Sequence, residues 1–100
     1  MPIYVTLVKT GAEGAKSMAD LDKAYEEGRK MSEQMGIKPI AAYGLLRPYD
    51  LMFIYEAADE KAAASSSLFQ SARWGGQMET WTAIPMEEFA KLTARLKAGS

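Results

Sequence analysis

The sequence from Tyr43 to Ala57 reads Tyr-Gly-Leu-Leu-Arg-Pro-Tyr-Asp-Leu-Met-Phe-Ile-Tyr-Glu-Ala. Two apolar runs flank the polar break Arg47–Asp50, in which proline presets the backbone for a tight turn and aspartate tolerates the conformation that closes it. The second run, Leu51 to Tyr55, is rich in the aromatic and branched residues that strands favour. The stretch therefore predicts a β-hairpin.

The second strand of this hairpin is apolar on both faces. Leu51, Phe53 and Tyr55 alternate with Met52 and Ile54, whereas an antiparallel strand with one wet face alternates apolar with polar residues. We therefore expect other parts of the protein, or of a second subunit, to cover both sides of this strand.

Composition excludes several classes of function. The 100-residue chain is 48% apolar and carries a net charge of −1, which gives no basic field for nucleic acid or for an anionic membrane. It contains neither Cys nor His, which excludes disulfides and every nucleophile that depends on a thiol or an imidazole. Three of the methionines, Met18, Met31 and Met35, recur at helical spacing and indicate core packing rather than Cu(I) binding. We expect no metal and no cofactor.

The periodicity of apolar residues and the positions of proline, glycine and capping residues predict the remaining elements. Residues 3–8 and 77–84 alternate as strands, 38–46 forms a strand with Pro39 near its start, and the stretch after Pro85 has a helical apolar spacing. Ser17 is expected to begin a helix that Gly36 ends, with Gly28 lying close to the sheet, and Asp59 to cap a helix over residues 60–73. The order is β-α-β-β-α-β plus a helix: an α+β, ferredoxin-like fold with a four-stranded antiparallel sheet, in which the first and third strands are central.

Both helices of such a fold cover one face of the sheet and leave the other bare. We expect Tyr4, Val8, Met52 and Ile54 on the bare face, which is too apolar to remain in contact with water. A second copy packed sheet against sheet is the expected cover, in a homodimer or larger assembly that encloses a small barrel.

With these elements placed, the chain resembles the GYD-domain family of the dimeric α/β-barrel superfamily. The resemblance spans about residues 2–92, and Pro48 replaces the glycine of the motif that names the family. It is carried by Tyr4-Val5, Thr10, Gly14, Tyr43, Tyr49-Asp50-Leu51, Glu56-Ala57, Asp59-Glu60, Glu79-Thr80 and Pro85-Met86-Glu87-Glu88-Phe89. The resemblance implies a dimeric barrel but no particular reaction, because the superfamily includes enzymes that need no cofactor as well as effector-binding modules.

Asp50 is the first candidate catalytic residue. At the mouth of the barrel it would act as a general base, with Tyr43 or Tyr49 as the proton or hydrogen-bond donor. The alternative is structural: Asp50 closes the turn, paired with Arg47, and Tyr49 covers the edge of the core.

Glu56 is the second candidate, because its parity places it on the same face as Met52 and Ile54. A carboxylate on an apolar face is costly unless it is paired, so Glu56 is either an acid–base group or an ion-paired residue at the end of the strand. Further residues could line a small-molecule cavity or equally a dimer core: Tyr4, Thr6, Glu79 and Trp81, with Arg47 and Tyr49 as additional ligand-binding candidates.

Two functions remain open from the sequence. The first is a homodimer that binds a small organic ligand between sheet and helices, with acid–base chemistry if it is an enzyme. The second is a non-catalytic interaction or effector-binding module. In either case we expect a cytoplasmic protein, because no leader or spanning segment is evident, with one domain over residues 1–98 and with Gly99-Ser100 as a cloning remnant.

Overall fold

A computed structural model describes residues 1–11 and 18–98 of the chain. Its elements follow the predicted order. They are β1 (Ile3–Lys9), α2 (Leu21–Gln34), β2 (Lys38–Gly44), β3 (Leu51–Glu56), α3 (Glu60–Trp74), β4 (Gln77–Ala83) and α4 (Met86–Ala98). The strands form one antiparallel sheet in the order β2-β3-β1-β4, so the α+β, ferredoxin-like prediction with central β1 and β3 is confirmed.

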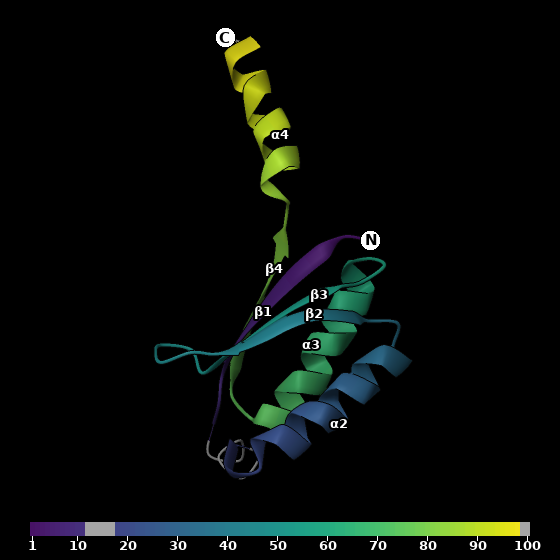
Figure 1. Ribbon diagram of the computed structural model, residues 1–100, viewed down its shortest axis with the longest axis vertical. Helices are drawn as coiled ribbons and strands as arrows, with labels where there is room; N and C mark the ends of the chain where they lie inside the picture. Colours follow the sequence, from purple (N-terminus) through teal and green to yellow (C-terminus); the bar gives the residue numbers. More distant parts are fainter. Residues whose placement is uncertain (12–17, 99–100) are drawn as a thin grey trace.

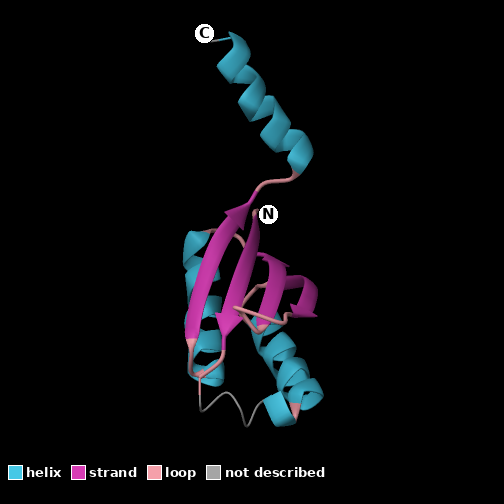
Figure 2. Ribbon diagram, turned by 90° about the vertical axis from the view of Figure 1, so that its left-hand side faces the viewer, coloured by secondary structure: helices cyan, strands magenta, loops and turns pink. Residues whose placement is uncertain are grey.

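Helices α2 and α3 cover the same side of the sheet (Figure 2). Helix α2 lies against β2, whereas α3 lies against β1 and β4, so the two helices diverge above β3 (Figure 1). Apart from Trp74 at the end of α3, their buried positions are small or polar: α2 buries Ala24, Gly28 and Ser32, and α3 buries Ala63, Ser66 and Gln70. Small side chains leave room between the helices, and this room becomes the cleft described below.

The predicted ends of two helices are confirmed. The Asp59 carboxylate accepts a hydrogen bond from the Ala62 amide at 2.9 Å, which satisfies one unpaired donor of the first turn of α3. Gly36 follows α2 with φ of 80°, a conformation that suits glycine. The predicted cap Ser17, the loop residue Gly14 and the terminal pair Gly99-Ser100 lie outside the described residues.

The strand register corrects the predicted composition of the bare face. Tyr4 opposes Tyr55, Val8 opposes Leu51, and both side chains are buried beneath the helices. Because opposed residues of an antiparallel pair project to the same side, Met52 and Ile54 share the bare face with Leu7 and Val5 instead. The prediction was right for Met52 and Ile54 and wrong for Tyr4 and Val8.

Two further details differ from the predictions. Gly28 faces α3 rather than the sheet, since a Cβ on it would lie 3.9 Å from Arg73 Nε and 4.0 Å from Gln70 Nε2. Strand β2 ends at Gly44, so residues 45–50 form a longer connection than the four-residue turn; within it the Leu45 amide donates to the Asp50 carbonyl at 2.8 Å.

Helix α4 extends away from the sheet as a separate rod (Figure 1). It begins after Pro85 and leaves Phe89, Leu92 and Leu96 exposed on its surface. The molecule is consequently elongated, measuring 53 × 30 × 19 Å. Within the described part of the chain, no helix is long and apolar enough to cross a membrane.

Candidate functional site

Asp50 is held by the end of β1. Its Oδ2 accepts from the Thr10 amide at 2.9 Å and from the Thr10 hydroxyl at 3.1 Å, and Arg47 Nη1 lies 3.9 Å from Oδ1. The two hydrogen bonds from Thr10, together with the charges of Arg47 and Lys9, lower the pKa of Asp50. A carboxylate stabilised in this way is a weaker base, so the geometry suits the turn-closing role.

Glu56 lies far from Asp50, whereas Tyr43 lies near it across the hairpin, where Gly44 pairs with Leu51. Glu56 is the last residue of β3. Its Oε2 lies 3.8 Å from Lys38 Nζ, which matches the alternative in which Glu56 is ion-paired at the end of the strand. Asp50 precedes the first residue of the same strand, so about 20 Å of extended chain separates the two carboxylates. Tyr43 is half-exposed beside Met52. The three candidate catalytic residues therefore do not converge on one reacting atom within a chain.

Tyr49 and Glu79 do lie together. Hydrogen bonding of the Tyr49 hydroxyl to Glu79 raises the pKa of Tyr49, and burial and the charge of Glu79 act in the same direction. Glu79 opposes Leu7 and Trp81 opposes Val5, so both β4 residues flank the bare face, where Trp81 is 56% exposed. These residues form the border of an apolar surface rather than the wall of an enclosed cavity.

Thr6 and Tyr4 occupy the opposite, helix-covered face. Thr6 Oγ1 lies 2.8 Å from the Tyr55 hydroxyl and 2.9 Å from Thr80 Oγ1, and Thr80 in turn contacts the Ser67 hydroxyl. Tyr4 stacks on Tyr55 with ring centroids 6.0 Å apart. The structure thus separates Tyr4 and Thr6 from Glu79 and Trp81, with which the sequence grouped them. Thr6 stands at the buried end of a chain of hydroxyls that reaches the surface at Thr80 and Ser67.

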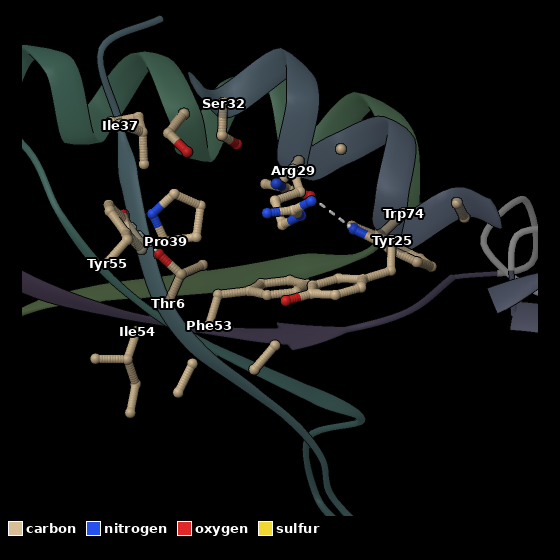
Figure 3. A pocket seen from close by; sticks show the side chains of 16 residues that line it. Thr6, Tyr25, Arg29, Ser32, Ile37, Pro39, Phe53, Ile54, Tyr55 and Trp74 are labelled. Carbon is tan, nitrogen blue, oxygen red and sulfur yellow. Dashed lines mark hydrogen bonds between the residues drawn. The ribbon is translucent and has the colours of Figure 1, made fainter. Parts of the chain in front are cut away.

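A cleft opens where α2 and α3 diverge above β3 (Figure 3). Its enclosed part has a volume of about 40 Å³, which is room for a few water molecules or for the polar end of a ligand. An apolar groove of about 560 Å³ adjoins it and shares Tyr25, Ala42, Phe53 and Trp74 with it. The remaining residues of the enclosed part are Thr6, Ala24, Gly28, Arg29, Ser32, Ile37, Pro39, Ala41, Ile54, Tyr55, Ser66 and Gln70.

The enclosed part contains polar groups without partners. Gln70 Oε1 accepts from the Trp74 indole at 2.8 Å. Among residues 1–11 and 18–98, no hydrogen-bond partner is found for Gln70 Nε2 or for the hydroxyls of Ser32 and Ser66, all on buried residues. Arg73 Nε, which lies next to the cleft but not in its lining, is buried and without a partner in the described part of the chain. The unpaired groups of the lining are open to water or to a ligand.

Two apolar surfaces outside the cleft have no partner within the chain. The first, which we call the open sheet face, combines Ile3, Val5 and Leu7 of β1 with Met52 and Ile54 of β3, all half-buried. The second is the apolar stripe of α4, formed by Phe89, Leu92 and Leu96. Clustered apolar side chains of this kind, open to solvent, indicate contact with other protein.

Sequence reasoning missed most of the cleft. Gly28, Ser32, Ser66 and Gln70 occupy core-facing helical positions at spacings of four residues. Polar or absent side chains at such positions were the available signal, because a packed helix normally places apolar residues there. The candidate residues predicted from the sequence lie instead in the turn and on the strands.

Two of three comparisons with known proteins found a match. The family model of the GYD domain matches residues 4–93. The chain is also similar to the glutamine synthetase and cystathionine beta-lyase binding protein of Thermus thermophilus, at 30% identity over 98 residues, which cover 97% of this chain and 100% of the relative. No solved structure matches.

Proposed function

Since the chain belongs to the GYD-domain family, we propose that it is a cytoplasmic, homodimeric accessory protein that binds metabolic enzymes and catalyses no reaction itself. The observation that carries this proposal is the pair of unpartnered apolar surfaces, the open sheet face and the stripe of α4. Separate surfaces allow one to join two copies while the other contacts an enzyme.

The open sheet face suits a second copy. Its centre is apolar, and its charged residues, Lys38, Glu56 and Glu79, lie at the borders. A flat patch of this kind can pack on itself about a two-fold axis, with the same residues contributing from both sides. Burial of the central side chains would be worth about 25 cal/mol for each Å² of apolar surface.

The stripe of α4 suits a groove on another protein. Phe89, Leu92 and Leu96 occupy positions i, i+3 and i+7 of one helix, the spacing with which amphipathic helices dock into apolar grooves. By likeness to the Thermus relative, the partners would be glutamine synthetase and cystathionine β-lyase of the source organism.

The assembly is tested by light scattering coupled to size exclusion. We expect twice the 11.0 kDa chain mass at micromolar concentration, and a monomer or aggregate for Met52→Lys, because a buried unpaired ammonium is unfavourable. Gln34→Lys, which adds the same charge at an exposed position of α2, should remain dimeric. A wild-type monomer at all concentrations would contradict the dimer.

Enzyme binding is tested by isothermal titration of the protein into each purified enzyme. Saturable binding to either enzyme supports the proposal. Absence of heat and of co-elution with both enzymes would contradict the assigned partners.

A second candidate function is the binding of a small organic ligand in the cleft, which the unpartnered polar groups around Gln70 favour. The ligand would then act as an effector of the accessory protein. Acid–base chemistry through Asp50, Glu56 and Tyr43 is the weaker form of this candidate, since Glu56 lies at the other end of β3 from Asp50 and both carboxylates have structural partners.

A further inference from the structure

The hydrogen-bond donors of the cleft select a class of ligand. Building on the ligand-binding function above, we infer that the cleft binds an uncharged, planar molecule through a carbonyl oxygen, which accepts a hydrogen bond from Gln70 Nε2. The apolar body of the molecule would extend over Tyr25 and Phe53 into the adjoining groove.

The orientation of the Gln70 amide is determined by Trp74. An indole N–H can only donate, so the atom 2.8 Å from it must be the amide oxygen. The NH₂ group then faces the opposite way, toward Gly28, at 4.0 Å from the position that a Cβ on Gly28 would take. Gln70 as a whole is 9% exposed, so most of the residue is shielded from bulk water.

Arg73 lies next to the cleft without lining it. Its Nη1 lies 3.6 Å from Glu27 Oε2 and its guanidinium lies over the Phe69 ring, 5.5 Å from the centroid. Its Nε is buried, so the donor that a ligand can reach is the Gln70 NH₂ group. Gly28 leaves open the space in front of this donor, because a glycine has no side chain there.

The charges around the cleft disfavour an anion. Arg29, the charged residue that lines the enclosed part, is 2.8 Å from Glu26 and 3.4 Å from Glu33. Arg73 is likewise paired with Glu27. Since three carboxylates surround two guanidinium groups, a carboxylate ligand would gain little net attraction, whereas a neutral carbonyl oxygen needs only the donor.

The aromatic residues favour a planar body. The rings of Tyr25 and Phe53 are parallel to within 4°, with centroids 6.5 Å apart. In Figure 3 both rings are seen edge-on beside each other, with Arg29 on the side of the helices. A flat molecule can lie on this pair while its oxygen occupies the 40 Å³ enclosed part, which is too small for a whole ligand.

The test is an NMR titration of ¹⁵N-labelled protein with benzamide, which is planar, neutral and carries a carbonyl group. Benzamide should shift the side-chain signals of Gln70 NH₂ in a saturable manner. Benzoate and toluene, matched in size, should bind about tenfold more weakly or worse, because one is charged and the other lacks the acceptor.

Gly28→Ala provides the matched variant. Its methyl group fits at ordinary contact distance but occupies the space in front of the Gln70 NH₂ group, so benzamide affinity should fall about tenfold or more while the protein stays folded. Gly44→Ala adds the same methyl group where nothing lies within 4 Å, and should leave affinity unchanged.

Three results would overturn the inference: no saturable shift with benzamide at millimolar concentration, equal affinity for all three compounds, or unchanged affinity in Gly28→Ala. Equal affinity for the three compounds would leave a ligand-binding cleft without the carbonyl selectivity, whereas no binding by any of them would contradict the ligand-binding function as well. Dimer mass and enzyme binding, measured on the same samples, report on the accessory function independently.

Discussion

Thr10 and Asp50 join the end of β1 to the start of β3, with two donors of Thr10 on one carboxylate oxygen at 2.9 and 3.1 Å. The Asp50 amide completes the link by donating to the Val8 carbonyl at 2.8 Å. The residue that the sequence offered as a catalytic base is thus an anchor of the hairpin. Its side chain is 17% exposed, which accords with that position.

Because of the contacts of Asp50, we expect the stability of the fold to depend on pH in the acidic range. The pKa of Asp50 is lowered in the folded protein, chiefly by the hydrogen bonds from Thr10. A lowered folded pKa stabilises the fold above the unfolded value, near pH 4, and the stabilisation is lost as pH falls through the folded value. Asp50→Asn should therefore lower the unfolding temperature at pH 7, and the difference from wild type should shrink below about pH 4.

Thr10→Val is the matched control for this prediction, because it removes the hydroxyl donor and keeps the amide donor. It should reduce the free energy of unfolding by about 1 kcal/mol at pH 7. If denaturant unfolding shows the Asp50→Asn difference to be constant from pH 7 to pH 3, charge on Asp50 contributes nothing to the anchor.

We expect a side chain at Gly11 or Gly76 to destabilise the fold. A Cβ on Gly11 would lie 2.0 Å from the Gly75 carbonyl oxygen, and one on Gly76 would lie 1.7 Å from that of Lys9. Since backbone atoms cannot move aside, Gly76→Ala should lower the free energy of unfolding by about 2 kcal/mol or more. Chemical denaturation checks this against Gly44→Ala, and equal midpoints for the two variants would refute the close approach.

The sequence was sufficient for the order of elements but not for the pairing of faces. The cap Asp59, the glycine after α2 and the position of Pro39 depend on local backbone chemistry, which a single stretch of sequence contains. Which side of β1 shares a face with Met52 depends on register, and a slip of one residue exchanges the two faces. Both faces of β1 and β3 are apolar, so no polar residue marked the correct choice.

The cleft was beyond sequence reasoning for a different reason. Gln70 Nε2 and Arg73 Nε lack partners because α2 and α3 diverge, and the angle between two helices depends on how all their neighbours pack. Asp50, by contrast, was correctly placed at a turn, and only its partner Thr10, some 40 positions earlier, required the structure.

Because of Tyr4, we expect the stability of the fold to depend on pH in the alkaline range. Burial, followed by the carboxylates of Glu60 and Asp59, raises the pKa of the Tyr4 hydroxyl. A raised folded pKa gives a stabilisation that is complete below the unfolded value, near pH 10, and is lost as pH rises through the folded value. Tyr4→Phe should therefore resist unfolding above about pH 10 better than wild type. Tyr43→Phe, at a half-exposed position, should behave as wild type, and coincident alkaline transitions for all three proteins would count against this role of Tyr4.

We expect substitutions in the apolar stripe of α4 to weaken enzyme binding and to leave the free energy of unfolding nearly unchanged. Phe89 and Leu92 remain exposed on a helix that extends away from the sheet (Figure 1), so the double variant Phe89→Ser, Leu92→Ser removes little packing. The free energy of unfolding should change by less than about 0.5 kcal/mol for each substitution, and the dimer mass should be unchanged. Affinity for the bound enzyme should fall by tenfold or more, because two apolar anchors of a docking helix are lost.

Lys91→Ser, on the same helix outside the stripe, controls for the loss of helix propensity. A double variant that binds the enzyme as wild type does would place the enzyme-binding surface elsewhere, and one that becomes monomeric would assign α4 to the dimer contact instead.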